Sequence, residues 1–189
     1  MSLWILTRFE TKEDRLVEVL DLYTETMLHR PWPLKLVRDS LWQRERFPKQ
    51  FLTLHGFANE NDAKTYQQSI GATNYPEQFA QICVTPPNIV YLECTHAVGG
   101  HMLVKPDEDF LSISHRIAEP GYGEQLAEEI EMIFSELTMI AGFRAGLVCV
   151  NQALEEEVYS FASWSKLEAF LASLPEIEVY KVLAYHRLK

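Results

Sequence analysis

Residues that could do chemistry gather in the second half of the chain, where His115, Asn151 and Trp164 are our candidates for catalysis. An imidazole titrates close to neutral pH, so His115 can act as a proton acceptor. The indole of Trp164 offers a flat apolar surface on which an aromatic ring can stack. Each residue also has a structural interpretation, because histidines and tryptophans at strand ends are often core residues. Arg116 follows His115 directly, so in a strand it points to the opposite face, and the two should not act in one pocket.

Motifs of several other kinds of site are absent from the sequence. There is no G-x-S-x-G, P-loop, G-x-G-x-x-G or Cys-x-x-Cys motif. The six histidines do not follow the spacing of zinc ligands: His29, His55, His96, His101, His115 and His186. We therefore expect no metal site.

The charge balance limits the partners of the protein. A net charge of −10 and an isoelectric point near 5.1 argue against nucleic acid and anionic membranes, since both reward clustered Lys and Arg. No apolar run approaches the roughly 20 residues that span a bilayer, and the first residues lack the basic region of a secretory signal. Three widely spaced cysteines, Cys83, Cys94 and Cys149, fit unpaired thiols in a reducing compartment. The sequence predicts a cytoplasmic protein.

The elements that must position these residues occur twice. Residues 40–57 match residues 147–164 in their pattern of apolar and polar positions, at one constant offset and without a gap. Residues 3–11 likewise match 111–119, and 89–96 match 179–186. The pattern of each half therefore predicts the same order of elements: a strand, a long helix, two strands, a short helix and a last strand. The pattern predicts long helices over residues 12–29 and 122–140, where apolar residues recur at spacings of three and four.

The tryptophan stands where the third strand of the second half gives way to its short helix. Ser165 and Glu168 have the spacing of a capping box, in which each side chain satisfies a free backbone amide at the helix start. An apolar residue before such a cap commonly packs against the helix, so Trp164 has one structural explanation already. The alternative is that its indole lines a pocket, and the sequence leaves both open.

A β-α-β-β-α-β order is the ferredoxin-like arrangement. We predict an α+β fold of two tandem ferredoxin-like units packed sheet to sheet. Residues 1–97 form the first unit, 98–109 a linker, and 110–189 the second. Residues 71–88 are predicted to be an irregular insertion in the first unit.

The second half resembles the antibiotic biosynthesis monooxygenase family of the dimeric α/β-barrel superfamily. The stretches that carry the resemblance are HRIAEPGYGEQLAEEIEMIF, GFRAGLVCVNQ and YSFASWSKLEAFLAS, with the Pro-Gly turn into the long helix and the Trp-Ser pair before the short one. They lie within residues 110–187, whereas residues 2–96 follow the family in layout only. The resemblance implies a tandem fusion in which a degenerate first half takes the place of a second subunit, with or without a further homodimer.

The resemblance also implies where functional residues should lie. In the haem-degrading branch of the family an Asn-Arg pair ends the first strand, and here His115 and Arg116 occupy those positions. Leu174 stands where that branch has its iron-binding histidine, so we expect no histidine-ligated haem complex. In the first half the matching positions hold Thr7, Arg8 and Phe57. A single active pocket should therefore belong to the second half.

The activity that the resemblance implies is a cofactor-independent monooxygenation of a quinol or polyphenol-like aromatic molecule. His115 would be the base, Asn151 or Arg116 would stabilise an enolate or superoxide, and Trp164 would stack on the substrate. Arg116, Phe161 and His186 are our candidates for substrate contact. Two alternatives stay open: a non-catalytic ligand-binding or regulatory protein on the same scaffold, and a haem-binding protein. A fold by itself does not decide among them.

Overall fold

The computed structural model describes residues 2–13, 15–28, 36–99, 110–165 and 178–186. Within it the chain forms two compact units, which are described one at a time. The N-terminal unit comprises Ser2–Val90 together with the end of β8 from Leu183, and the C-terminal unit comprises Tyr91–Val182. Each unit combines antiparallel strands with helices, so the predicted α+β class is confirmed. The packing of one sheet on the other stays a prediction.

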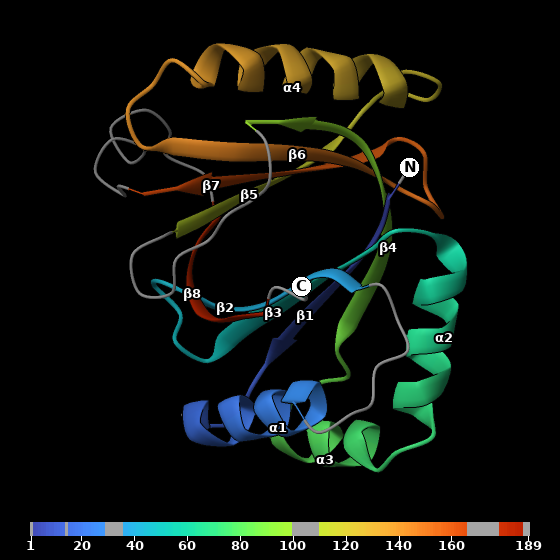
Figure 1. The fold of residues 1–189 in the computed structure, drawn as a ribbon, viewed down its shortest axis with the longest axis vertical. Coiled ribbons are helices and arrows are strands. Elements are labelled where there is room, and N and C mark those ends of the chain that lie inside the picture. Colours follow the sequence, from blue (N-terminus) through green and yellow to red (C-terminus); the bar gives the residue numbers. More distant parts are fainter. Residues whose placement is uncertain (1, 14, 29–35, 100–109, 166–177, 187–189) are drawn as a thin grey trace. The chain divides into compact units, whose positions relative to one another are not determined.

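The N-terminal unit is built on a three-stranded sheet in the order β1-β3-β2. Its strands are β1 (Ser2–Glu10), β2 (Leu36–Arg44) and β3 (Gln50–Phe57), and both pairings are antiparallel. Figure 1 shows α1 (Leu16–Leu28) and α3 (Tyr75–Ile82) lying together on one side of this sheet, with α2 (Glu60–Gly71) next to them. A core of apolar side chains, among them Ile5, Phe51 and Phe57, fills the space between the sheet and the helices.

The segment predicted as an irregular insertion contains the helix α3, so that prediction is wrong for its middle part. Pro76 lies in the first turn, where a proline costs nothing because the amide it lacks has no helical partner. The buried Phe79 and Ile82 fix the helix to the core of the N-terminal unit. Their spacing, three positions apart, was the helical signal in this stretch.

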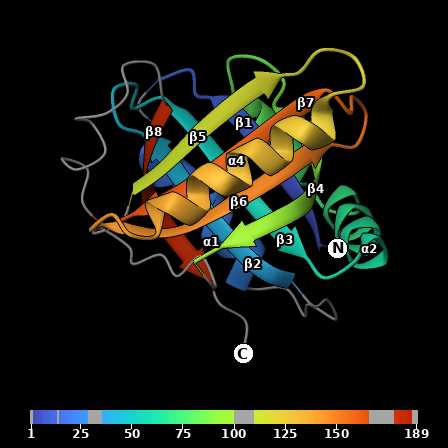
Figure 2. The ribbon, with the colours of Figure 1, turned by 90° about the horizontal axis from the view of Figure 1, so that it is seen from above.

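The C-terminal unit has strands in the order β8-β5-β7-β6-β4. Its strands are β4 (Asn88–Val98), β5 (Phe110–Ile117), β6 (Phe143–Asn151), β7 (Glu157–Trp164) and β8 (Glu178–His186). The pairings of β4 with β6, β5 with β7, β5 with β8 and β6 with β7 are antiparallel. Figure 2 shows α4 (Gly123–Leu137) lying along β6 and β7. Ala127, Ile130 and Phe134 bury the apolar stripe of α4 against this sheet.

The bounds of the strands agree with the offset seen in the sequence. The shift that carries β2 onto β6 also carries β3 onto β7, and within each pair the strands are equally long. One strand departs from the expected grouping, because β4 pairs with β6 and belongs to the C-terminal unit. The predicted short helix after Trp164, with Glu168 of its capping box, lies outside the described residues. No helix in the described ranges is long and apolar enough to cross a membrane.

Candidate functional site

The residues predicted for one pocket lie on two faces of the C-terminal sheet. Trp164 shares its face of β7 with Val158 and Ala162, and all three belong to the core beneath α4. Arg116 is paired with Val158, so it projects toward the same side. The sheet therefore places Trp164 and Arg116 on the same face but at opposite ends of the paired strands β5 and β7, since Trp164 pairs with Phe110 and Arg116 with Val158.

Three further candidates, His115, Phe161 and Asn151, occupy the opposite face of the same sheet. His115 is paired with Tyr159, and Phe161 follows two positions later on β7. Asn151 ends β6 on this face, two positions after the Cys149 that faces Tyr159. Of His186 the structure gives the backbone in β8 and nothing of the side chain.

Trp164 is buried beside α4, with 4% of its surface exposed. Its indole nitrogen donates a hydrogen bond of 3.0 Å to the hydroxyl of Ser112 on the neighbouring strand. Its ring meets the edge of Phe143, with centroids 5.2 Å apart and an interplanar angle of 75°. The polar atom has a partner and the ring is packed, as expected of a tryptophan that anchors a sheet to its helix.

A polar cluster surrounds Glu157 on the face away from α4. One carboxylate oxygen, Oε2, accepts hydrogen bonds from the Asn151 amide at 2.9 Å and the Tyr159 hydroxyl at 3.3 Å, and His115 Nε2 lies 3.4 Å from it. The His115 ring stacks on the Tyr159 ring, with centroids 4.3 Å apart and planes within 10°. About a third of the His115 side chain remains exposed. This cluster brings together His115 and Asn151, two of the predicted residues, around a carboxylate that sequence reasoning missed.

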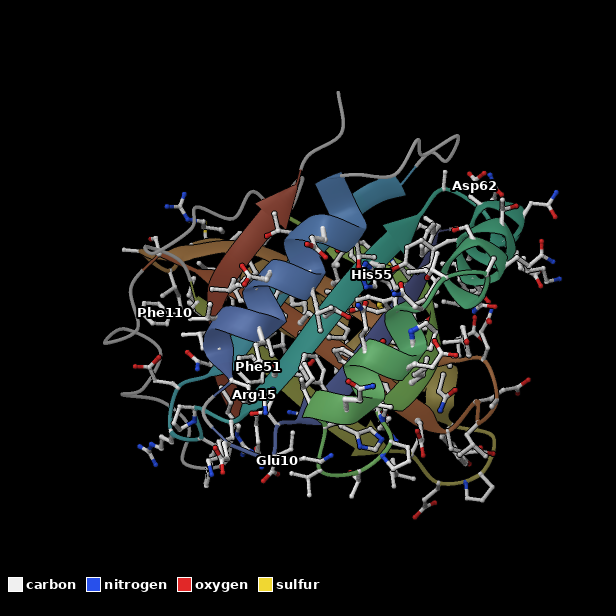
Figure 3. All side chains as sticks on the ribbon, turned by 90° about the horizontal axis from the view of Figure 1, so that it is seen from below. Glu10, Arg15, Phe51, His55, Asp62 and Phe110 are labelled. Carbon is white, nitrogen blue, oxygen red and sulfur yellow. The ribbon has the colours of Figure 1, made fainter. Side chains whose placement is uncertain are left out.

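The N-terminal unit, which was expected to be degenerate, contains a more deeply buried pair. Asp39 of β2 and His55 of β3 are direct neighbours in the strand pairing. His55 Nδ1 lies 2.7 Å from Asp39 Oδ1, the carboxylate side chain is completely buried, and the imidazole is 7% exposed. Figure 3 shows His55 on its strand, on the side of the sheet where the helices pack.

Two tyrosines from the helices complete this group. The hydroxyl of Tyr66 on α2 lies 3.3 Å from Nε2, the other ring nitrogen of His55. Burial raises the pKa of Tyr23 on α1 well above its usual value, and the Asp39 carboxylate, to which the phenol is hydrogen-bonded, raises it further. Tyr23 is therefore a neutral donor to Asp39 at any physiological pH. We call Tyr23, Asp39, His55 and Tyr66 the buried histidine group.

The arrangement matches what a general base needs. A carboxylate beside one ring nitrogen holds the imidazole in a single orientation, while the other nitrogen receives the proton. Here Asp39 is the orienting group, and Nε2 faces a hydroxyl through which a proton can pass. Low exposure strengthens these electrostatic contacts because water does not screen them.

A signal for His55 is present in the sequence, although it was missed. Phe51, Thr53, His55 and Phe57 alternate along β3, so the histidine lies on the same face as two core phenylalanines. A polar residue at such a position needs a buried partner. That the partner is Asp39 depends on the strand register, which the sequence does not display.

A shallow groove of about 660 Å³ lies where β5 ends and α4 begins, lined by Arg116, Tyr122 and Glu129 among others. It is open to solvent and carries charges of both signs. Among the described residues, no group of three or more His, Cys, Asp and Glu side chains could hold a metal ion. Leu174, at the expected place of a haem ligand, lies outside those residues.

Comparison with known proteins identifies the fold. No family model matches the sequence, and no curated protein is significantly similar to it. Among solved structures, one described as a candidate monooxygenase from Fusobacterium nucleatum superposes with a TM-score of 0.81 at 11% identity, over 98% of this chain and 94% of the other. An anthrone oxidase-like protein superposes with a TM-score of 0.75 at 15% identity, over 98% of this chain and 92% of the other. A candidate monooxygenase from Lactobacillus acidophilus superposes with a TM-score of 0.71 at 11% identity, over 98% of this chain and 96% of the other. The chain thus shares the fold of these three proteins.

Proposed function

We propose that the protein is a small-molecule monooxygenase that acts on a quinol or polyphenol-like aromatic substrate without a bound cofactor. The observation that carries the proposal is the contact of 2.7 Å between Asp39 and His55, buried beneath the helices of the N-terminal unit. The names of the similar structures, candidate monooxygenase and anthrone oxidase-like protein, point to the same class of reaction.

The chemistry explains why a buried, oriented histidine suits this reaction. Oxygen accepts electrons from an organic molecule readily only when that molecule is deprotonated, so the protein must first remove a phenolic or benzylic proton. His55 would take this proton through the Tyr66 hydroxyl, 3.3 Å away, and Asp39 would stabilise the imidazolium that forms. For an anthrone-like methylene, one oxygen atom then enters the product as a carbonyl, and the other leaves as water with the two hydrogens.

The cluster around Glu157 is the second candidate for the base. His115 there lies beside a carboxylate as well, at 3.4 Å, and its larger exposure gives a substrate easier access. Asn151 would then stabilise the anionic oxygen and Phe161 would contact the substrate. Trp164 and Arg116 would not take part, because they lie on the other face of that sheet.

Activity measurements on matched histidine variants distinguish the two sites. Oxygen uptake is recorded with an anthrone, a hydroquinone and a flavonol, and the rate without protein is subtracted. We expect turnover by the purified protein, a loss of about 100-fold or more in kcat for His55→Gln, and little change for His115→Gln. Asp39→Asn should lower kcat as well, because the imidazolium loses its partner.

Each variant also needs a stability measurement, since the buried histidine group is part of a core. A thermal unfolding curve of His55→Gln that still shows one cooperative transition assigns the lost activity to chemistry. Turnover that depends on His115 and not on His55 would move the active site to the Glu157 cluster. Specific binding of the aromatic probes without oxygen uptake in any form of the protein would favour a ligand-binding role and overturn the proposal.

A further inference from the structure

Two of the three cysteines face each other across neighbouring strands. Cys94 of β4 and Cys149 of β6 are direct partners in the antiparallel register. Both thiols are free, and a hydrogen bond joins them. Cys149 is in turn paired with Tyr159 on β7, so the two sulfurs lie on the face of the C-terminal sheet that is turned away from α4.

Their spacing suits a covalent bond. Residues directly opposite each other in an antiparallel pair have Cα atoms about 4.5 to 5.5 Å apart. Disulfides form over Cα separations of roughly 4.4 to 6.8 Å. Both side chains project from the same face, so no strand has to turn for the sulfurs to meet.

The two thiols differ in their access to solvent. Cys94 keeps 9% of its surface exposed, whereas Cys149 has none. Cys94 also lies at an irregularity, because the register of β4 against β6 shifts between Cys94 and His96. Its thiol contacts the carbonyl of His96 at 3.4 Å. A reagent from solution therefore meets Cys94 first.

We propose that Cys94 and Cys149 form a reversible dithiol–disulfide site that a hydroperoxide oxidises. The Cys94 thiolate attacks the peroxide oxygen, so that a sulfenic acid forms and the alcohol or water leaves. The Cys149 sulfur then attacks the sulfenic sulfur, the disulfide forms, and the departing hydroxide leaves as water with the Cys149 proton. Each sulfur loses one electron, and the peroxide gains two.

The burial of the other thiols fits this order of events. Burial raises the pKa of Cys149 well above its usual value, and its contact with Cys94 raises it further, so Cys149 is a poor first nucleophile. Cys83 belongs to the N-terminal unit, and burial raises its pKa to about 11. Cys83 takes no part in the proposed reaction, so it serves as the internal control for the reactivity of a buried thiol.

Oxidation would change the sheet as well as the thiols. The bond would tie β4 to β6 and close a loop that contains β5 and α4. Such a cross-link restricts the unfolded chain, so the oxidised protein should unfold at a higher temperature. The site would thus convert exposure to peroxide into a change in the stability of the C-terminal unit.

Mass spectrometry after treatment with hydrogen peroxide tests the proposal. We expect the intact protein to lose two hydrogen atoms, a non-reducing peptide map to link Cys94 to Cys149, and dithiothreitol to reverse both changes. Cys83→Ser should behave like the unaltered protein. Cys149→Ala should stop at a sulfenic acid on Cys94 that dimedone traps, whereas Cys94→Ala should yield no trapped species.

Two results would overturn the inference. One is a peptide map without the Cys94–Cys149 link, either because the linked peptide contains Cys83 or because no linked peptide forms after complete reaction of Cys94. The other is dimedone capture at Cys149 in the Cys94→Ala variant, which would make the buried thiol the first to react. Thermal unfolding of both variants before oxidation confirms that each still folds, so that a negative result counts against the proposal.

Discussion

Asp39 is a carboxylate without exposed surface, and the side chains around it explain how the fold tolerates it. A buried ionised carboxylate is costly unless charged or hydrogen-bonding groups face it. His55 supplies a cation when it is protonated, and Tyr23 supplies a neutral donor. Three apolar side chains in place of Tyr23, Asp39 and His55 would fill the same space at a lower cost in free energy. We therefore infer that these polar residues serve a chemical role.

Trp164 offers a prediction about stability. Trp164→Phe removes the indole donor to Ser112, and we expect the free energy of unfolding to fall by about 1 to 2 kcal/mol. Ser112→Ala should cost a similar amount, because it leaves the buried N–H without its partner. The double variant should lose less than the sum, as chemical denaturation can show. A strictly additive pair, or a loss of substrate binding without a loss of stability, would mean that the indole has another role.

The buried acids predict how stability depends on alkaline pH. In the fold, burial raises the pKa of Cys83 from 9.0 to about 11 and raises the pKa of Tyr23 well above its usual value. Both groups stay protonated in the native state at a pH where the unfolded chain already loses their protons. Their stabilisation is therefore complete below about pH 9 and is lost as the pH rises.

Urea denaturation between neutral and alkaline pH measures this effect. The free energy of unfolding should hold steady near neutrality and decline above about pH 9. Cys83→Ala should make this decline less steep, and the rest of it comes from groups such as Cys149, whose pKa burial also raises. Tyr23→Phe is the companion variant, which should flatten the most alkaline part of the curve. An identical decline in all three proteins would show that neither group is responsible.

At the scale of elements, Gly146 determines how closely α4 approaches its sheet. A Cβ atom at Gly146 on β6 would overlap the ring of Phe134, which is buried in the same core. The helix can therefore lie on the strand only because this position has no side chain. Phe57 ends β3 and Trp164 ends β7. Each packs into the core under the helices of its own unit.

Alanine substitutions at Gly146 and Gly71 should differ in their effect on the free energy of unfolding. Gly146→Ala should lower the free energy of unfolding by about 1 to 3 kcal/mol, since the phenylalanine ring has to move. Gly71→Ala, at the end of α2, meets nothing within 4 Å and should be neutral or slightly stabilising. Thermal unfolding of both variants checks the contrast. Equal effects at the two positions would contradict the close packing of α4.

For the whole molecule, the strand β4 links the two halves of the sequence. It comes before the linker in the chain and yet hydrogen-bonds to β6, which comes after the linker. The compact units therefore differ from the predicted division at residues 98–109, because residues from Tyr91 onward group with the second half. A chain divided at the linker would take a strand away from the C-terminal sheet.

This grouping predicts the behaviour of two fragments. Residues 1–99 and 100–189, expressed separately, should be unstable, and the second should suffer more because β6 loses its hydrogen-bonded neighbour. Expressed together, they should purify as a complex. Circular dichroism and co-purification through a tag on one fragment give the measurement. A second fragment that unfolds cooperatively at the temperature of the intact chain would contradict the grouping.

The order and bounds of most elements could be predicted from the sequence alone. Apolar spacing and turn residues act over a few positions, so they predict helices and strands directly. For that reason the offset between the two halves of the sequence reappears in the bounds of β3 and β7. Local alternation in a strand also placed His115 and Arg116 on opposite faces. The helix α3 was missed, since its short apolar spacing lies among turn-forming residues.

Which residues meet depends on the tertiary structure. Asp39 and His55 are partners because β2 and β3 pair in one register, and a shift by one residue would have turned the two side chains to opposite faces. The same holds for Cys94 and Cys149, and for Trp164 and Ser112. Register depends on turns and on packing across the whole sheet, which no local pattern contains. The residues predicted for one site therefore lie on two faces of the C-terminal sheet. The buried histidine group lies in the half for which the sequence predicted no active pocket.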